Sequence, residues 1–455
     1  MYITLNQTVE KPVIVTFHAS KNTDEPFRVE SNGDAGHRTY SVNYDNTSEQ
    51  GERDETLRRA AAELCRQIRV EKHKLLQLNT AGLDAEPILA FVEGLQLADY
   101  SFDRYKSKTP HHITQLNIVS RKLKAAQLAP YRNLWNRIFW CREWINLPVA
   151  DLNAERFADE LQAVANDLKV QCKVYDKKEI EKLAMGGLLA VNRGSVDEPR
   201  LVVLEYDGTH GRQPIPMALV GKGIMYDTGG LNIKPDDYMQ EMKSDMAGAA
   251  TMASVVFAAA DNQLPIHLVA VLPLTDNRPG FNAYAADDIL TMYDGTTVEV
   301  INTDAEGRLI LADALAYAVK QFNPSLLIDA ATLTGAAVRA ISTYGIAAVQ
   351  QNAEVEMQQL KKVGECVHQR IAELPFWKEY DELIHSEVAD IKNCGPAQAG
   401  TITAGKFLAH FVKKTPYIHL DIAGVAYFTK AQAPYGPGAS GYGVRLLYDF
   451  IQSKI

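Results

Sequence analysis

The chain has 455 residues, of which 46% are hydrophobic and 23% charged, and its net charge is −9 at neutral pH. This length allows two domains or one large one, and the composition is that of a globular protein with a sizeable core. The acidic balance argues against nucleic acid as a partner of the whole chain. No apolar run approaches the roughly 20 residues that a membrane-spanning helix requires.

The N-terminus and the cysteines together indicate the cellular compartment. The first residues, MYITLNQTVEKPVIVTF, lack the basic stretch and the apolar stretch of a secretory signal. The five cysteines are widely spaced and form no CxxC pair, which argues against a disulfide framework or a thiolate zinc site. We therefore predict a cytoplasmic protein.

The first third of the chain mixes strand and helix patterns. Strands are predicted at 12–17, 39–44 and 111–120. Helices are predicted at 54–76, 86–102 and 134–146. Pro148 would end the last of these helices, and Asp151 or Asn153 could cap the next one. The expected division is a smaller N-terminal α/β domain, residues 1–147, and a larger catalytic domain, residues 148–455.

The rest of the chain alternates strands and helices more regularly. Strands are predicted at 200–208, 215–227, 266–274, 297–304, 325–333 and 417–424. Helices are predicted at 242–261, 307–322, 404–414 and 442–454. This alternation predicts an α/β fold whose larger domain has a mixed, mostly parallel sheet with helices on both faces.

The stretch VGKGIMYDTGG, residues 220–230, first suggests a loop that cradles phosphate. A P-loop requires Ser or Thr after its lysine, but Gly223 follows Lys222. A dinucleotide fingerprint requires a third glycine where this chain has Tyr226. Both nucleotide-binding motifs are therefore absent from this stretch.

Charged side chains interrupt the apolar patterns of the larger domain, although burial of a charge is costly unless it is paired or bound to metal. They are Lys222, Asp227, Lys234, Asp245, Asp304, Glu306 and Arg308. At a strand end, residues i and i+2 point to one side, so Asp304 and Glu306 can converge. With Asp227 and Asp245 they would make four carboxylates, a set that suits one or two divalent metal ions.

Each of these residues also has a purely structural interpretation. A lone aspartate at a strand end is more often a helix cap than a metal ligand, and TDAEG alone could be a capping box from Thr303 to Glu306. Lys222 and Lys234 could form ordinary salt bridges, and Arg308 could pair with a carboxylate. Taken jointly, however, the residues favour a metal site.

Three segments, VGKGIMYDTGGLNIKP, MKSDMAGAAT and NTDAEGRLILADAL, resemble the signatures of the leucyl aminopeptidase family, the cytosolic di-zinc exopeptidases. Weaker similarity extends the resemblance over roughly residues 90–455, and the first 90 or so residues match no family pattern. The resemblance implies a metal-dependent aminopeptidase that forms homohexamers, with active sites facing an interior cavity.

The resemblance also implies roles for single residues. Two divalent ions, zinc or manganese, would be held by Lys222, Asp227, Asp245, Asp304 and Glu306. Asp227 and Glu306 would bridge the ions, Lys222 and Asp245 would complete one site, and Asp304 would complete the other. A lysine ligand must be neutral, so its pKa has to be strongly lowered near the ions.

The remaining roles concern the substrate. The substrate's α-amine would bind the ion at Lys222 and Asp245, and Lys234 would stabilise the developing oxyanion. Arg308 would hold a bicarbonate ion that serves as the general base. Residues that match the family's substrate-binding positions are Met242, Asn302 and Leu333. An apolar pocket would favour leucine- or methionine-like first residues of a peptide.

Some positions depart from the family pattern. Ala247-Gly248 replaces a usual Gly-Gly pair, and Asp276-Asn277 with Phe281 alters a neighbouring segment. That segment is expected to supply no metal ligand, so that its changes would leave catalysis intact. Two alternative functions stay open, a nucleic-acid-binding homologue and a dimetal hydrolase of phosphoesters. The acidic charge argues against the first, and the complete ligand set argues against a loss of catalysis.

Overall fold

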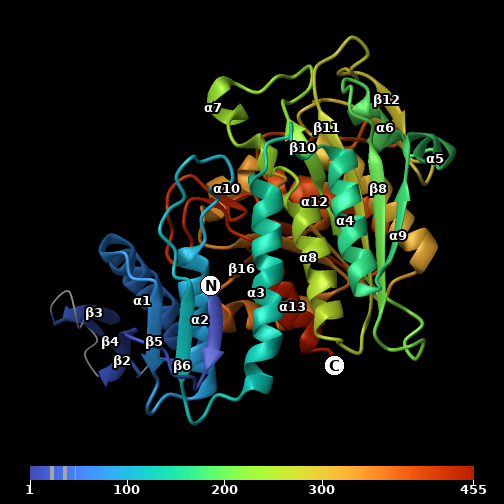
Figure 1. The fold of residues 1–455 in the computed structure, drawn as a ribbon. Helices are drawn as coiled ribbons and strands as arrows, with labels where there is room; N and C mark the ends of the chain where they lie inside the picture. The colour runs from blue at the N-terminus through green and yellow to red at the C-terminus, as the bar shows by residue number, and fades with distance from the viewer. Residues whose placement is uncertain (21–24, 34–37, 47) are drawn as a thin grey trace. The chain divides into compact units, whose positions relative to one another are not determined.

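A computed structural model describes residues 1–20, 25–33, 38–46 and 48–455 (Figure 1). The chain divides into two compact units. The smaller comprises residues 1–139 with the segments 365–368 and 428–440, and the larger comprises 140–364, 369–427 and 441–455. The division falls within helix α3 (Ala125–Asn146), while the boundary at residues 147/148 stays a prediction.

The smaller unit contains a six-stranded sheet in the order β1-β6-β5-β2-β4-β3, in which only β3 is antiparallel to its neighbour. Its strands are β1 (Tyr2–Leu5), β2 (Val13–Ser20), β3 (Phe27–Asn32), β4 (Thr39–Asp45), β5 (Leu75–Asn79) and β6 (Gln115–Val119). Helices α1 (Gln50–Glu71) and α2 (Ala85–Asp99) pack against each other. The helix predicted to reach Leu76 ends at Glu71, because Lys72 adopts a left-handed backbone and Leu75 already begins β5.

The larger unit is built on a nine-stranded sheet in the order β16-β15-β18-β14-β9-β11-β8-β7, with β10 also paired to β11. Its strands are β7 (Gln171–Tyr175), β8 (Arg200–Asp207), β9 (Met217–Gly221), β10 (Gly223–Asp227), β11 (His267–Asn277), β14 (Leu326–Ala331), β15 (Ile346–Gln351), β16 (Ile371–Glu373) and β18 (Tyr417–Asp421). Five of the eight strand pairs are parallel, which confirms the predicted mixed, mostly parallel sheet.

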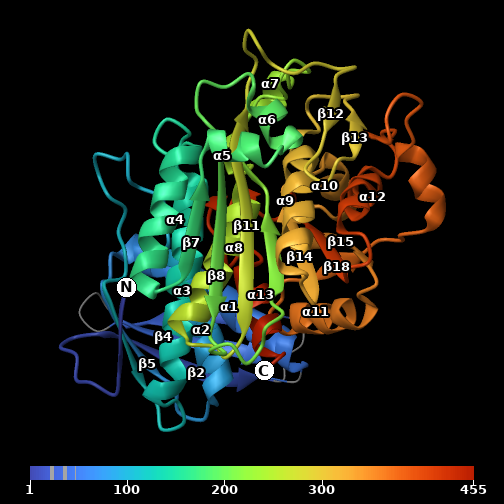
Figure 2. The ribbon, with the colours of Figure 1, turned by 90° about the vertical axis from the view of Figure 1, so that its right-hand side faces the viewer.

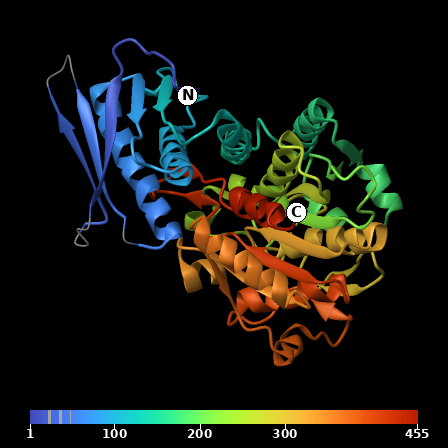
Figure 3. The same cartoon turned by 90° about the horizontal axis from the view of Figure 1, so that it is seen from below.

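Helices cover both faces of this sheet (Figures 2 and 3). One face packs against α4 (Ala154–Leu168) and α8 (Ala247–Asp261), with α13 (Val444–Gln452) packed on α8. The other face packs against α6 (Gly186–Asn192), α9 (Glu306–Phe322) and α12 (Gly400–Val412). Asn153 is the cap of α4, since its side chain accepts a hydrogen bond from the backbone N–H of Arg156. Within the described ranges, no helix combines the length and apolar character needed to cross a membrane.

The remaining elements of the larger unit are short connections around the sheet. They include α5 (Lys177–Lys182), α7 (Asp236–Met239), α10 (Gly335–Ile341), α11 (Glu354–Cys366), β12 (Ile289–Thr291), β13 (Thr297–Glu299), β17 (Ile391–Lys392) and the 3₁₀ turns Met242–Ser244 and Lys378–Ile384. Strands β19 (Tyr427–Phe428) and β20 (Gly438–Ala439) form a separate pair, and Phe428 and all of β20 lie in the segment 428–440 of the smaller unit.

The strand predicted at 215–227 is two strands, interrupted at Lys222. Its backbone N–H donates to the carbonyl of Ala330 on β14, and its carbonyl accepts from the N–H of Ala249 on α8. The first bond keeps Lys222 beside β14, and the second ties its carbonyl to the start of α8. Strand β9 ends at Gly221, and β10 pairs with β11. The interruption places Lys222 at the edge of the sheet.

Four neighbouring strands run in the same direction, and their carboxyl ends therefore meet at one edge of the sheet. These strands, β9, β11, β14 and β18, end at Gly221, Asn277, Ala331 and Asp421. In open α/β sheets, ligands bind in the crevice outside the carboxyl ends of parallel strands. This edge is where the charged residues singled out in the sequence come together.

A buried polar pair inside the sheet predicts a pH-dependent stability. His419 Nδ1 lies 2.8 Å from Asp329 Oδ1, and neither side chain is exposed. Burial would lower the pKa of His419, but Asp329 raises it above its ordinary value of 6.5. A raised histidine pKa contributes stability below the unfolded-state pKa and loses it as the pH rises through the folded-state pKa.

We expect the difference in Tm between the wild-type protein and a His419→Gln variant to be larger at about pH 6 than at about pH 9. Thermal unfolding of both proteins at the two pH values measures it. If the difference in Tm is the same at both pH values, His419 and Asp329 do not form a charged pair in the folded protein.

Candidate metal centre

Lys222 lies where strand β9 and the starts of helices α8 and α9 come closest. A Cβ atom on Gly248 would lie 2.0 Å from the carbonyl oxygen of Ala330, so only glycine allows α8 to approach the sheet here. A Cβ atom on Gly307 would lie 2.3 Å from Cε of Lys222. Gly307 therefore makes room for the Lys222 side chain beside the first turn of α9. The retained glycine of the Ala247-Gly248 pair is the one that this packing requires.

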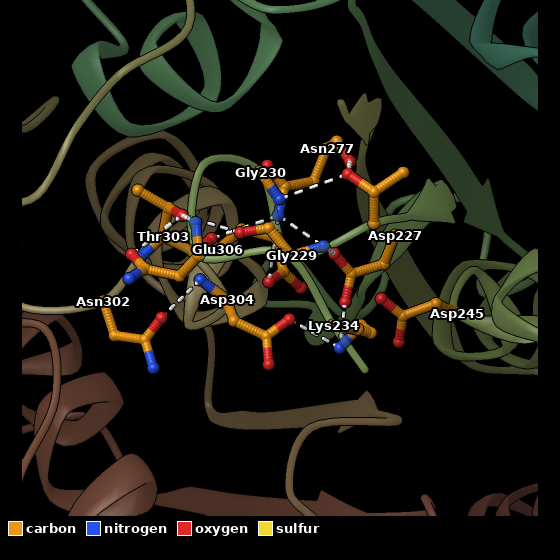
Figure 4. A network of polar contacts seen from close by, with 12 residues as sticks. Asp227, Gly229, Gly230, Lys234, Asp245, Asn277, Asn302, Thr303, Asp304 and Glu306 are labelled. Carbon is orange, nitrogen blue, oxygen red and sulfur yellow. Dashed lines mark hydrogen bonds and ion pairs between the residues drawn. The ribbon is translucent and has the colours of Figure 1, made fainter. Parts of the chain in front are cut away.

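The Lys222 ammonium lies among buried carboxylates. Its Nζ is 2.8 Å from Asp245 Oδ1, 3.0 Å from Glu306 Oε1 and 2.9 Å from the carbonyl oxygen of Thr332. Asp227, Asp245 and Glu306 each have a carboxylate oxygen within 4.8 Å of the other two, and all three residues are buried (Figure 4). The structure thus brings four of the five predicted metal ligands into one cluster.

Asp304, the fifth predicted ligand, joins this cluster through Lys234 (Figure 4). Lys234 Nζ lies 2.7 Å from Asp227 Oδ2 and 2.6 Å from Asp304 Oδ1. The Asp304 side chain is 33% exposed, whereas that of Asp227 is 3% exposed. Asp304 is therefore on the more exposed side of the cluster.

Asp304 and Glu306 approach the cluster from a turn, so the strand-end geometry expected from the sequence is wrong. Strand β13 ends at Glu299, and Glu306 is the first residue of α9. The turn is closed by the backbone N–H of Asp304, which donates to Asn302 Oδ1 at 2.8 Å. The capping-box alternative is also wrong, because Thr303 Oγ1 donates to the carbonyl of Gly229 and α9 has no side-chain cap.

The charges of the cluster favour a bound cation. Burial raises the pKa of Asp245, Asp304 and Glu306, and the charge of Asp227 raises each further. Burial would lower the pKa of Lys222, but the carboxylates of Asp245 and Glu306 raise it above its usual range. The lowered pKa expected for Lys222 as a metal ligand stays a prediction, since it depends on the positive charge of the ions.

The donor set fits divalent cations. With every group ionised, four carboxylates would face two ammonium groups, and this excess of negative charge is what raises the pKa of the buried carboxyls when no cation is bound. One oxygen of Asp245, Oδ2, is buried and has no hydrogen-bond partner in the part of the chain that the structure describes. A buried carboxylate oxygen without a partner is costly, and a hard cation that prefers oxygen ligands would satisfy it.

Arg308 belongs to a different set of contacts. Its Nη1 donates to the carbonyl of Asn393 at 2.8 Å, while its buried Nε has no acceptor among the described residues. Asn393 Oδ1 in turn accepts from the backbone N–H of Ile301 at 2.7 Å. Asn393 therefore holds both Arg308 and the segment that leads to Asp304, a contribution that the sequence analysis missed.

Asn277 is the other residue that the sequence analysis missed. It lies in the segment that departs from the family pattern, which is expected to supply no metal ligand. Yet Asn277 Nδ2 lies 2.9 Å from Asp227 Oδ1 and 3.4 Å from Glu306 Oε2 (Figure 4). Its position could have been anticipated, because it ends strand β11, which runs parallel to β9 beside Lys222.

The three predicted substrate-binding residues lie next to members of the cluster in the chain, and all three are partly exposed. Met242 is in the 3₁₀ turn that leads to Asp245. Asn302 accepts the hydrogen bond that closes the Asp304 turn. Leu333 follows Thr332, whose carbonyl accepts from Lys222. Their contact with a substrate stays a prediction.

The sequence of the chain matches a known protein family over the region that contains this cluster. The sequence pattern of the cytosol aminopeptidase family, catalytic domain, matches residues 139–448, and that of the family's N-terminal domain matches residues 48–109. The second match corrects the expectation that the first 90 or so residues match no family. The family pattern thus reaches into the smaller unit.

Related proteins extend the similarity over most of the chain. A probable cytosol aminopeptidase of Syntrophotalea carbinolica is 41% identical over 412 residues, covering 88% of this chain and 82% of that protein. One of Chlorobaculum tepidum is 40% identical and covers 89% and 84%. The structure of the bottromycin maturation enzyme BotP in complex with Mn has a TM-score of 0.88 and 30% identity, covering 98% of this chain and 99% of BotP. The chain therefore belongs to the cytosol aminopeptidase family of metal-dependent peptidases.

Proposed function

We propose that the protein removes N-terminal amino acids from peptides, with a preference for leucine- or methionine-like residues. The observation that carries this proposal is the buried cluster of Lys222, Asp227, Asp245 and Glu306 at the carboxyl edge of the sheet. A negative, buried cluster with an unpartnered carboxylate oxygen needs a cation, and membership of a family of metal-dependent peptidases supplies the reaction class.

We infer that this cluster binds two divalent ions, zinc or manganese. Lys222 and Asp245 would hold one ion, Asp304 would hold the other, and Asp227 and Glu306 would contact both. When bound, such ions lower the pKa of a water molecule and polarise the scissile carbonyl group. Lys222 would contribute its amine only after losing its proton, which the positive charge of the bound ions would favour.

The protein's own cationic side chains complete the proposed mechanism. Lys234 is held against Asp227 and Asp304 on the more exposed side of the cluster, where its ammonium would donate to the oxyanion that develops on the attacked carbonyl. Arg308 has a buried Nε with no acceptor among the described residues, and this group would bind bicarbonate as the proton carrier. The substrate's free α-amine would lie on the side of Lys222 and Asp245, which restricts cleavage to the first residue.

Further proposals rest on the family resemblance. We infer that the protein forms homohexamers in the cytoplasm. We also infer that Met242, Asn302 and Leu333 line the pocket for the first residue of the peptide. The catalytic domain is proposed to begin near residue 148.

Hydrolysis of a leucine anilide by the purified, metal-loaded protein tests the proposed function. We expect release of the amine with Mn²⁺ or Zn²⁺ and loss of the activity after treatment with a chelator. A blocked substrate, acetyl-leucine anilide, is the matched control, because it lacks the free α-amine and should not be cleaved. Cleavage of a phosphoester without any cleavage of aminoacyl anilides would contradict the proposal.

A further inference from the structure

One amide group reaches both carboxylates that are proposed to contact the two ions. Asn277 Nδ2 lies within hydrogen-bonding distance of Asp227 Oδ1, at 2.9 Å, and of Glu306 Oε2, at 3.4 Å. The same nitrogen lies 3.0 Å from the carbonyl oxygen of Thr303. Asp227 ends β10, whereas Thr303 and Glu306 belong to the turn and first residue of α9, so a single buried side chain at the end of β11 connects these two segments (Figure 4).

The chemistry of the surroundings fixes the orientation of this amide. All three neighbours of Nδ2 are acceptors, two carboxylates and a carbonyl, and only the NH₂ side of the amide can donate to them. The opposite orientation would place the amide oxygen against these negative oxygens. Oδ1 instead faces Gly230, where an added Cβ atom would lie only 2.8 Å away. Asn277 is therefore a donor to the cluster and is held in one orientation.

A second donor from the same segment reaches the same carbonyl. The hydroxyl of Tyr284 donates to the carbonyl oxygen of Thr303 at 2.6 Å, and Tyr284 is 1% exposed. The Thr303 carbonyl belongs to the peptide group that immediately precedes Asp304. Two donors on one carbonyl fix the plane of that peptide and hence the direction in which the Asp304 side chain leaves the turn.

We propose that Asn277 and Tyr284 are positioning residues of the metal centre: they hold Asp227, Glu306 and the Asp304 turn in their arrangement before a cation binds. This inference rests on the proposed metal centre and adds two residues that touch no ion themselves. Carboxylates that repel one another need such donors, because donated N–H and O–H groups offset part of the repulsion. Partners that orient metal ligands typically change metal affinity or activity by about 10–100-fold when they are removed.

The test compares metal binding by the full-length, metal-stripped protein and its variants. Asn277→Leu removes the amide donor at similar size, and Tyr284→Phe removes only the hydroxyl. Titration calorimetry with Mn²⁺ alone should show an affinity about 10–100-fold lower for each variant. Because both donors act on the Thr303 carbonyl, the double variant should lose less than the sum of the two single losses in free energy.

Two control variants make the same chemical changes away from the cluster. Asn117→Leu removes a buried amide that donates to the carbonyl of Gln7 in the smaller unit, and Tyr417→Phe removes a buried hydroxyl that donates to Asp329. Both controls should lower Tm without lowering Mn²⁺ affinity. If Asn277→Leu does not fold, Tyr284→Phe decides alone.

The proposal is overturned if Asn277→Leu and Tyr284→Phe, the site variants, bind Mn²⁺ with affinities within about twofold of the wild-type affinity. A change that small is below the range expected when an orienting partner is removed. It is also overturned if the controls lose as much affinity as the site variants, since the loss would then reflect general destabilisation. Failure of the wild-type protein to cleave aminoacyl anilides would count against the proposed function instead. Mn²⁺ affinity is measured without substrate, so the two failures are distinguishable.

Discussion

A Glu306→Ala variant is expected to lose both its bound metal and its peptidase activity. Glu306 is 1% exposed, ion-paired with Lys222 and close to Asp227 and Asp245. Its removal takes away one of the two carboxylates proposed to contact both ions, so neither site would keep a full set of ligands. Metal content after equilibration with Mn²⁺ and dialysis, measured by mass spectrometry, and the rate of leucine anilide cleavage check the expectation.

Arg308→Ala is the matched comparison, since Arg308 lies on the same first turn of α9 but contacts Asn393 and not the carboxylates. This variant should keep the metal content of the wild-type protein and lose rate, because it removes only the proposed bicarbonate-binding group. Circular dichroism of both variants confirms that the fold is retained. An Arg308→Ala protein without metal, or a Glu306→Ala protein with full metal content, would contradict the assigned roles.

A Lys234→Met variant is expected to lose about 10²–10³-fold in kcat, the usual cost of removing one donor to a developing oxyanion. Methionine keeps most of the length of the side chain and removes the charge. KM should change little, because the lost interaction forms mainly in the transition state. Metal affinity should not fall, since Lys234 opposes cation binding at Asp227 and Asp304. Steady-state kinetics with leucine anilide and Mn²⁺ titration separate these effects.

Lys406→Met serves as the control for loss of a buried ammonium. Lys406 is 9% exposed, pairs with Asp381 at 3.1 Å and lies over the ring of Phe376. Its replacement should lower stability and leave kcat close to the wild-type value. An unchanged kcat in Lys234→Met, with or without a rise in KM, would show that Lys234 does not act on the reacting carbonyl.

Elements with continuous apolar runs were predicted well from the sequence, and the turn and strand break that direct the site residues were not. Strand β8 and helix α9 lie where the sequence placed them, because buried strands and long helices have strong periodic patterns. The strand predicted at 297–304 stops at Glu299, since the following residues are held by bonds to side chains, such as the one that the Ile301 N–H donates to Asn393 Oδ1. Such bonds join residues 92 apart in the chain and leave no local pattern.

The sequence by itself determined the family and the residue types of the candidate metal centre, because the carboxylates and lysines stand in short, specific motifs. Only the tertiary structure decided how they meet. Parallel strands bring Lys222 and Asn277 to one edge of the sheet, and a turn before α9 directs Asp304 and Glu306 toward it. The physical reason is that a local pattern records burial and periodicity, whereas hydrogen bonds between distant segments, such as those of Asn277, depend on which strands are neighbours.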